Sequence, residues 1–216
     1  MKKIEIIELK HLHWKLFPEI EDKLNSFRKV WFEENDERLW EELVFCLLTP
    51  QSRAETCWKA VESLKSKELI LNGNEKEILS ELKGIRFKTK KAYYIIEARK
   101  SFNYSGKLKI KEILASCETP FKMREWLTKN VKGIGYKEAS HFLRNIGLGD
   151  NLAILDRHIL SFMLDMKLIE RITLSLSKKK YLEIEEVLRN FSQKIDIPLV
   201  HLDFVLWYLK TGRIFK

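Results

Sequence analysis

Helix-breaking residues are scarce in this chain of 216 residues, which has four prolines and eight glycines. They separate segments of ordinary helix length, and no segment alternates apolar and polar residues between turn signals. Apolar residues instead recur at i, i+3, i+4 and i+7, as at Ala139, Phe142, Leu143 and Ile146. The pattern disfavours strands and predicts an all-α fold.

Cysteine and long apolar runs are scarce as well. Cys46, Cys57 and Cys117 are odd in number and widely spaced, so they form neither a disulfide framework nor a zinc-ligand pattern. No stretch holds 18 uncharged apolar residues, and Glu5 and Glu8 interrupt any signal-peptide core near the start. We therefore expect a cytoplasmic protein with no membrane partner.

The pattern predicts where the helices lie. They are expected near residues 4–14, 19–32, 38–48, 53–66, 75–82, 89–102, 109–116, 120–130, 136–146, 157–167, 178–192 and 199–210. The stretch "NIGLGDNLA" (145–153) is short, polar and rich in glycine, so it is the best candidate for a crossing between two helical lobes.

Positive charge is in excess, at a formal +9 with an isoelectric point near 9.3. Such a balance favours a polyanionic partner, although a basic protein without one has the same composition. The predicted phosphate contacts lie in or near the segment "RFKTKK" and the stretch "VKGIG", and they are Arg86, Lys88, Lys90, Lys91 and Lys132.

The stretch "VKGIGYKEAS" predicts a turn that leads into a helix. Gly133 and Gly135 can adopt positive φ and let a ligand approach the backbone closely. The N–H groups at the start of the next helix favour an anion such as a DNA phosphate, although a tight turn between helices has the same pattern. Lys137 follows in the first helical turn, as a candidate nucleophile or as an ordinary solvated lysine.

Asp156 follows the apolar run "LAIL" and precedes residues at helical spacing, which predicts a helix N-cap. A purely structural cap is one interpretation. The other is a fixed negative charge that stabilises a developing positive charge on a sugar.

Together, "VKGIGYKEA" and "LDRHIL", with Lys137 and Asp156 19 residues apart, resemble the helix–hairpin–helix DNA glycosylases. The chain is similar in particular to the prokaryotic 8-oxoguanine DNA glycosylase/lyases, which are smaller than the eukaryotic enzyme. The similarity also covers "LVFCLLTPQSRAE", "GIRFKTKKAYYIIEAR", "LSKKKYLEIEEVLR" and "WYLKTGRIFK", and so spans nearly the whole chain.

The resemblance implies two helical lobes with a DNA-binding cleft between them. One lobe would be residues 36–150 with the helix–hairpin–helix, and the other residues 1–35 and 151–216. The damaged nucleotide would be rotated out of the duplex. Lys137 would attack the sugar C1′, expel the base and form a Schiff base that permits β-elimination, while Asp156 would stabilise the cationic sugar.

The resemblance assigns further roles residue by residue. Phe87, Trp207 and the terminal Lys216 would recognise the base, and Gln51 would fill the gap that the flipped base leaves. Gly133, Gly135 and His158 would contact DNA phosphates. The main-chain carbonyls of Lys129, Val131 and Ile134 would hold a monovalent cation. Core packing of the aromatic residues and a frayed tail are the alternatives.

One departure separates the chain from relatives that hold an iron–sulfur cluster, because no cysteine follows Cys117. No iron–sulfur cluster and no required cofactor are therefore expected. The expected partner is double-stranded DNA containing a damaged base, bound by a monomer. A glycosylase for another damaged base and a non-catalytic helix–hairpin–helix DNA-binding protein remain the alternatives.

Overall fold

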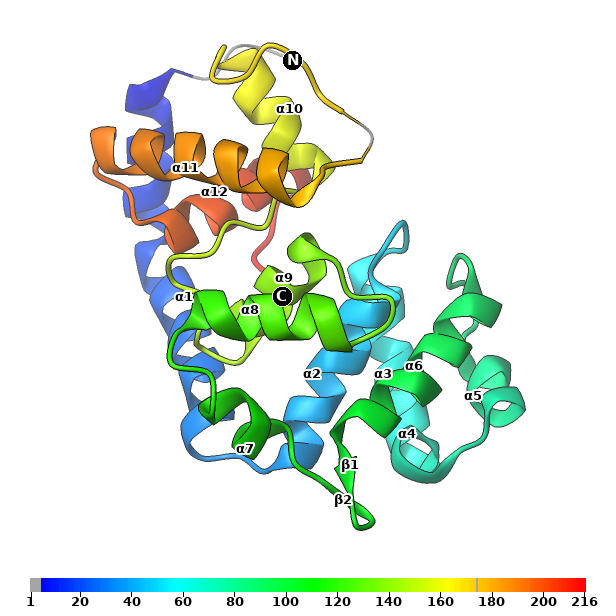
Figure 1. The fold of residues 1–216 in the computed structure, drawn as a ribbon. Coiled ribbons are helices and arrows are strands. Elements are labelled where there is room, and N and C mark those ends of the chain that lie inside the picture. Colours follow the sequence, from blue (N-terminus) through cyan, green and yellow to red (C-terminus); the bar gives the residue numbers. More distant parts are fainter. Residues whose placement is uncertain (1–4, 174) are drawn as a thin grey trace.

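The computed structural model describes residues 5–173 and 175–216, which are mostly helical (Figure 1). The helices are α1 (Ile6–Phe32), α2 (Asp36–Leu48), α3 (Ala54–Ser66), α4 (Leu69–Asn72), α5 (Glu75–Glu81), α6 (Lys88–Phe102), α7 (Ile110–Ala115), α8 (Pro120–Asn130), α9 (Tyr136–Asn145), α10 (Arg157–Asp165), α11 (Lys178–Lys194) and α12 (Leu199–Thr211). The all-α prediction is confirmed.

A small hairpin is the exception to this pattern. The strands β1 (Asn103–Tyr104) and β2 (Lys107–Leu108) pair antiparallel through two residues each. They are too short to show alternation in the sequence, so periodicity gave no sign of them.

The two predicted helices at 4–14 and 19–32 are one helix, and residue 4 lies outside the described residues. Pro18 sits inside α1. Proline removes one backbone hydrogen bond and usually kinks or ends a helix. Here a buried stripe continues on both sides of it, through Leu9, Leu16, Ile20, Leu24, Phe27 and Val30. Packing of this stripe outweighs the local propensity to break.

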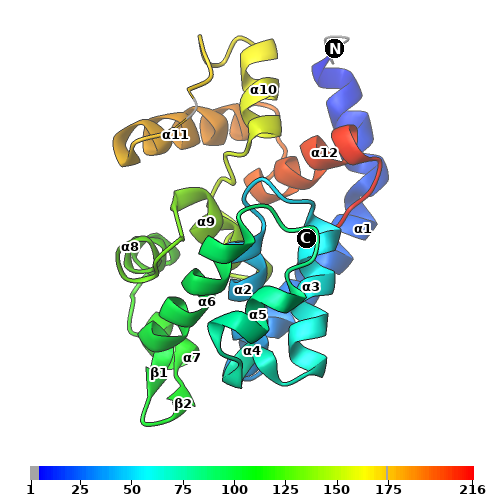
Figure 2. The same ribbon diagram turned by 90° about the vertical axis from the view of Figure 1, so that its right-hand side faces the viewer.

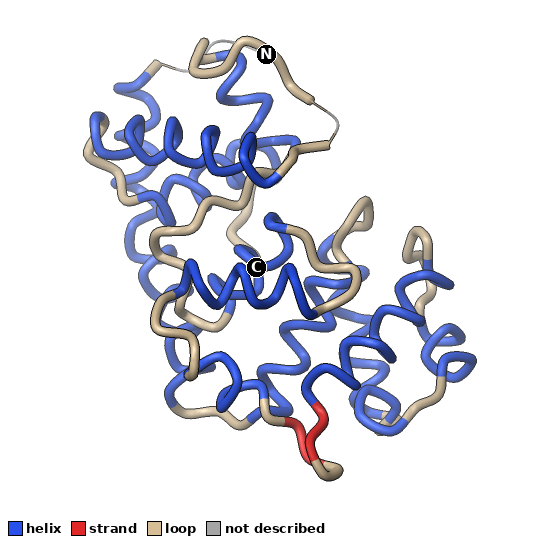
Figure 3. The backbone as a smooth tube through the Cα atoms, viewed as in Figure 1, coloured by secondary structure: helices blue, strands red, loops and turns tan. Residues whose placement is uncertain are grey.

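Two hydrophobic cores divide the chain. The first runs from Val30 to Leu152 and includes α2 to α9, while the second contains residues from Leu9 to Phe27 and from Ala153 to Leu206. Figure 1 shows α10, α11 and α12 grouped at one end, and α1 running along both groups. The chain passes between the cores at residues 150–155, here called the crossing segment, which is the yellow-green stretch of backbone between α9 and α10 in Figure 2. In Figure 3 it is drawn as irregular backbone.

Candidate active site

The predicted turn between α8 and α9 forms, but only one of its glycines needs to be glycine for conformational reasons. Gly133 has φ +90°, and a Cβ there would lie 2.4 Å from a ring carbon of Tyr94. Gly135 has φ −99°, so the expectation of positive φ at this position is wrong. Its N–H instead donates to Oε2 of Glu138 at 3.2 Å, which fixes the entry into α9.

Gly133→Ala is expected to destabilise the protein by about 2–4 kcal/mol. Left-handed backbone costs a residue with a Cβ about 1–2 kcal/mol, and the overlap with the Tyr94 ring adds to that. Gly106→Ala is the matched control, because Gly106 has φ +81° but a Cβ there would meet no heavy atom within 4 Å. Urea unfolding measures both variants, and equal losses would contradict a role for the Tyr94 contact.

Lys137 lies in the first turn of α9 with a quarter of its side chain exposed. Its Nζ lies 3.1 Å from Oε1 of Glu138, the same carboxylate that accepts from the Gly135 N–H. Glu138 therefore ties the lysine to the turn that precedes it. His141 lies one helical turn further along α9 and is buried, which lowers its pKa well below the usual value and keeps its ring neutral.

Asp156 caps α10 as the sequence predicts. Its Oδ1 accepts from the backbone N–H of His158 at 2.8 Å and of Ile159 at 2.9 Å. Both bonds use the same oxygen, so the cap leaves the other carboxylate oxygen for a second task. A carboxylate at a helix N-terminus is also stabilised in its charged form.

A partly buried ion pair links the surroundings of Asp156 to the helix that carries Lys137. Asp203 on α12 pairs with Arg144, which lies two turns after Lys137 on α9. Burial raises the pKa of Asp203 to about 6, the nearby charge of Asp156 adds to this shift, and Arg144 opposes it. No local sequence pattern indicates this pair, because its members are 59 residues apart.

Gln51 and Phe87 occupy two loops that the structure brings together. Both residues are exposed and adopt left-handed backbone, with φ of +56° and +55°. The Ser52 hydroxyl accepts from the Arg86 N–H at 3.1 Å and so fastens the Gln51 loop to the Phe87 turn. The exposure of 54% for Phe87 means that its ring is not part of a core.

Lys91 is not the phosphate contact that its place in "RFKTKK" suggested. It is 4% exposed, and its Nζ donates at 2.7 Å to the carbonyls of Leu48 and Pro50. Burial lowers the pKa of Lys91 to about 8. Its ammonium group caps the C-terminal end of α2 and supports the loop that carries Gln51, whereas Arg86, Lys88, Lys90 and Lys132 are exposed.

Trp207 packs beside the start of α10 rather than inside a core. Its ring meets the His158 ring edge to face, with centroids 5.7 Å apart. Its indole Nε1 is buried without a hydrogen-bond partner. Burial lowers the pKa of His158, so this residue offers a neutral ring two positions after Asp156.

The chain end is packed instead of frayed. The Lys216 ammonium lies 3.3 Å from the centroid of the Trp58 ring and pairs with Glu42. Glu42 is fully buried and also accepts from Arg38 at 2.5 Å and from the Asn145 amide at 3.1 Å. We call Glu42, Trp58 and the neighbouring Phe45 ring the lysine cage. Cation–π contact and a buried counter-ion both stabilise an ammonium group there.

Comparison with known proteins decides the family. A family model described as 8-oxoguanine DNA glycosylase matches residues 20–197. The chain belongs to the 8-oxoguanine DNA glycosylase family. The glycine turn, Lys137 and Asp156 all fall within the matched region of this glycosylase-family chain.

Relatives match over their whole length. An 8-oxoguanine DNA glycosylase/AP lyase of Fusobacterium nucleatum is 40% identical over 100% of both chains. One of Methanocaldococcus jannaschii is 41% identical, over 100% of this chain and 99% of the relative. The crystal structure of the M. jannaschii glycosylase/lyase in complex with a 15mer DNA containing 8-oxoguanine matches with a TM-score of 0.88 at 36% identity, covering 98% and 99% of the two chains. The 8-oxoguanine DNA glycosylase of Thermotoga maritima matches with a TM-score of 0.88 at 36% identity over 98% of each chain.

The cation prediction for the glycosylase hairpin stays a prediction. The Val131 carbonyl accepts from the Ile134 N–H at 3.2 Å, which leaves one lone pair, and Lys129 and Ile134 lie on either side of it. Within residues 5–173 and 175–216, no group of three or more His, Cys, Asp or Glu side chains is placed to hold a metal ion.

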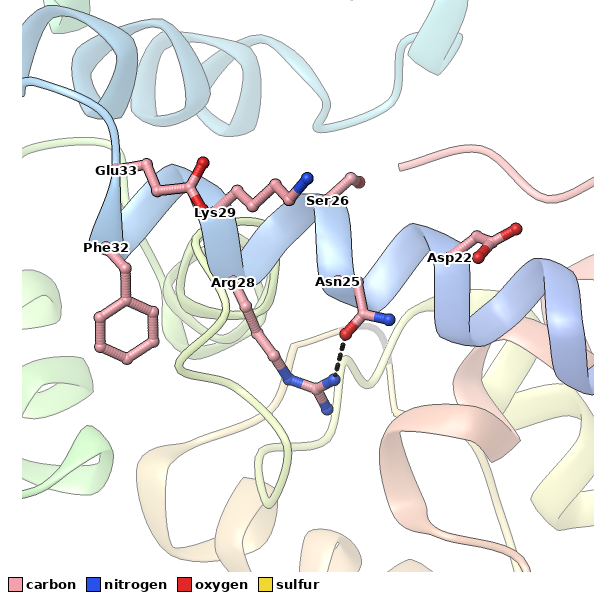
Figure 4. Close-up of a pocket in the computed structure, with 7 residues that line it drawn as sticks. All are labelled: Asp22, Asn25, Ser26, Arg28, Lys29, Phe32 and Glu33. Atoms are coloured by element: carbon pink, nitrogen blue, oxygen red, sulfur yellow. Dashed lines mark hydrogen bonds between the residues drawn. The ribbon is translucent and has the colours of Figure 1, made fainter.

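Two hollows of the described surface are lined by neither Lys137 nor Asp156. A groove of about 670 Å³ runs along α1 between Asp22 and Glu33, where Arg28 donates to Asn25 (Figure 4). Another, of about 750 Å³, lies along α8 beside Tyr136 and Lys178. No helix in the described part of the chain is long and apolar enough to cross a membrane.

Proposed function

We propose that this protein excises 8-oxoguanine from duplex DNA and then nicks the strand by β-elimination through a Schiff base on Lys137. The observation that carries the proposal is the pairing of two groups in a chain of this family. The Lys137 amine lies at the start of α9, and Asp156 caps α10 with one carboxylate oxygen. Asp203, which feels the charge of Asp156, pairs with Arg144 of α9.

The chemistry divides between the two groups. The Lys137 amine leaves its contact with Glu138 and attacks C1′ of the extruded nucleotide, which breaks the glycosidic bond. Asp156 stabilises the positive charge that develops on the sugar, using the oxygen that the cap leaves free. The sugar ring then opens by cleavage of the C1′–O4′ bond, O4′ takes up a proton, and the adduct becomes a Schiff base on Lys137. The Schiff base allows loss of a proton from C2′ and of the 3′ phosphate.

The surrounding residues hold the DNA. Gly133, Gly135 and the α9 N-terminus bind a phosphate, assisted by His158 at the start of α10. Gln51 fills the space left by the extruded base, and Phe87 and Trp207 line the base pocket. The exposure of Gln51 and Phe87 and the unpaired indole Nε1 of Trp207 support these assignments.

The remaining expectations are part of the same proposal. The protein acts as a cytoplasmic monomer without a membrane partner. The amine and the carboxylate carry the reaction without a required cofactor or an iron–sulfur cluster. The carbonyls of Lys129, Val131 and Ile134 hold a monovalent cation that steadies the hairpin against the DNA phosphate.

Lys216 completes base recognition in this proposal. With its ammonium group held in the lysine cage, its terminal carboxylate accepts a hydrogen bond from the N7–H of 8-oxoguanine, which guanine lacks. An unpaired donor in a closed pocket costs about 1–3 kcal/mol, equivalent to about 5- to 150-fold in discrimination.

Deleting Lys216 is therefore expected to slow excision of 8-oxoguanine by about 5- to 150-fold. Cleavage at a pre-formed abasic site should change much less, because no base is recognised there. Glu42→Gln, which weakens the hold on the ammonium group, should act in the same direction. Arg213→Gln is the control, because Arg213 lies in the same tail but pairs with Glu55 outside the cage. Equal activity of the truncated and intact chains on both substrates would remove Lys216 from the base pocket.

A panel of duplexes tests the function as a whole. Each duplex carries one damaged base and is incubated with the protein and borohydride, which reduces a Schiff base to a stable adduct. We expect an adduct and a nicked strand with 8-oxoguanine. An adduct with another damaged base alone would make this a glycosylase for that base, and binding without any adduct would make it a non-catalytic DNA-binding protein.

A further inference from the structure

Side chains of α11 form hydrogen bonds with the backbone of the crossing segment that leads to Asp156. The Tyr181 hydroxyl donates to the Ala153 carbonyl at 2.7 Å and accepts from the Leu155 N–H at 3.3 Å. Oε1 of Glu185 accepts from the Ala153 N–H at 2.8 Å. Three backbone groups within the three residues before Asp156 are thus bound by two side chains that lie one helical turn apart.

The same carboxylate connects this segment to the other core. Arg124 on α8 donates to both oxygens of Glu185, at 2.6 and 2.8 Å. The Arg124 guanidinium also donates to the Ser140 hydroxyl at 3.1 Å, and Ser140 lies three residues after Lys137 on α9. A continuous path therefore runs from the helix of Lys137, through Ser140, Arg124 and Glu185, to the backbone that leads to Asp156.

A second contact reinforces this path. The ring of Tyr136, which directly precedes Lys137, lies 5.4 Å from the Tyr181 ring, measured between centroids. The Arg124 guanidinium stands over both rings, at 5.3 and 5.7 Å. Cation–π contacts of this kind favour one arrangement of the three side chains.

Burial makes the network rigid. Arg124, Tyr181 and Glu185 are each at most 3% exposed. A buried charge that loses its partner is strongly destabilising. Each charged member of the network is therefore kept in contact with its partner. Burial also raises the pKa of Tyr181, so its hydroxyl keeps the proton that it donates to Ala153.

We propose that Arg124, Tyr181 and Glu185 are positioning residues, which fix the Asp156 carboxylate relative to the Lys137 amine across the boundary between the two cores. The inference rests on the proposed function, since it assumes that both groups act in excision. Helix α9, which carries Lys137, contributes to one core, and α10, which Asp156 caps, contributes to the other. An irregular segment joins the two helices, so local structure alone does not set the separation of Lys137 and Asp156. A displacement of about 1 Å costs reactions of this kind about 100-fold in rate.

A double-mutant cycle tests the proposal. Tyr181→Phe removes one hydroxyl and keeps the ring, so it frees the Ala153 carbonyl and the Leu155 N–H from their partner. We expect single-turnover excision of 8-oxoguanine to slow about 10- to 100-fold at unchanged affinity for the duplex. In an Asp156→Asn background the same change should have little further effect, because the group that it positions is already lost. Arg124→Lys, which keeps the charge but loses the bidentate geometry, should behave in the same way.

Ser192→Ala is the matched control, because this buried hydroxyl of α11 bonds within its own helix, to the Arg189 carbonyl. It should excise at the wild-type rate. Excision by Tyr181→Phe at the wild-type rate would overturn the proposal. So would a loss of equal size in both backgrounds, because that is the result of general destabilisation. Normal excision by Asp156→Asn alone would instead overturn the proposed role of the aspartate, and with it the premise of the cycle.

Discussion

Lys137→Gln is expected to abolish the borohydride-trapped adduct with DNA containing 8-oxoguanine and to lower strand cleavage by about 10³-fold or more. Removal of a nucleophile that forms a covalent intermediate has effects of this size or larger. The glutamine amide keeps much of the side-chain length but has no basic nitrogen to form a Schiff base. The Lys137 side chain is partly exposed and makes one ion pair, with Glu138, so stability should change by about 0.5 kcal/mol or less.

Lys132→Gln is the control for a loss of charge in the same hairpin. Lys132 is exposed and donates to the Tyr93 hydroxyl at 3.0 Å, so its ammonium group is placed at the surface near the turn. This variant should trap the adduct normally. Its affinity for undamaged duplex should weaken. The slope of the logarithm of the binding constant against the logarithm of the salt concentration should become shallower by about 0.9, which corresponds to the loss of one phosphate contact. Efficient trapping by Lys137→Gln would mean that another amine is the nucleophile.

Local patterns predicted the elements that carry the site. The apolar spacing of α9 and the aspartate before α10 each have a short-range cause. In the first case the cause is one apolar face of the helix, and in the second it is the unpaired N–H groups at the helix start. Such causes act within about one helical turn, so the sequence alone is enough to predict these elements. The same reasoning failed at Pro18, where the buried stripe of α1 outweighs a local rule.

These local patterns could not predict contacts between residues that are far apart in the sequence. Lys91 has the sequence context of a phosphate-binding lysine, yet its ammonium group donates hydrogen bonds to carbonyls 41 and 43 residues earlier in the chain. Glu42 has the context of a surface residue in a helix, yet it lies buried against a lysine 174 residues later. A charged residue on a helix is usually solvated, and only the tertiary structure shows which ones are not.

This limit explains why the sequence could name the two proposed catalytic groups but could not place them relative to each other. Lys137 and Asp156 each belong to a short motif. The residues that join their surroundings are Arg144, Asp203, Arg124 and Glu185, and each pairs across 59 or 61 residues of chain. None of these four belongs to the motifs of the glycine turn or the cap. The motifs therefore indicate the proposed chemistry, whereas the long-range ion pairs that join the surroundings of the two groups appear only in the structure.

Asp156→Asn should separate the two tasks of this carboxylate. Asparagine is also a good N-cap and keeps an oxygen to accept from the N–H groups of His158 and Ile159, so stability should change by less than about 1 kcal/mol. The negative charge is lost, and excision of 8-oxoguanine should slow by about 100-fold or more, while affinity for DNA stays nearly normal. The pKa of Asp203 should also fall, because the charge of Asp156 raises it in the native protein.

Asp165→Asn is the control, since it removes one exposed charge at the far end of α10 and should leave excision unchanged. A fall in the pKa of Asp203 would show that Asp156 is charged in the native protein. If the asparagine variant nevertheless excises at the wild-type rate, excision does not use this charge, and Asp156 is a cap alone.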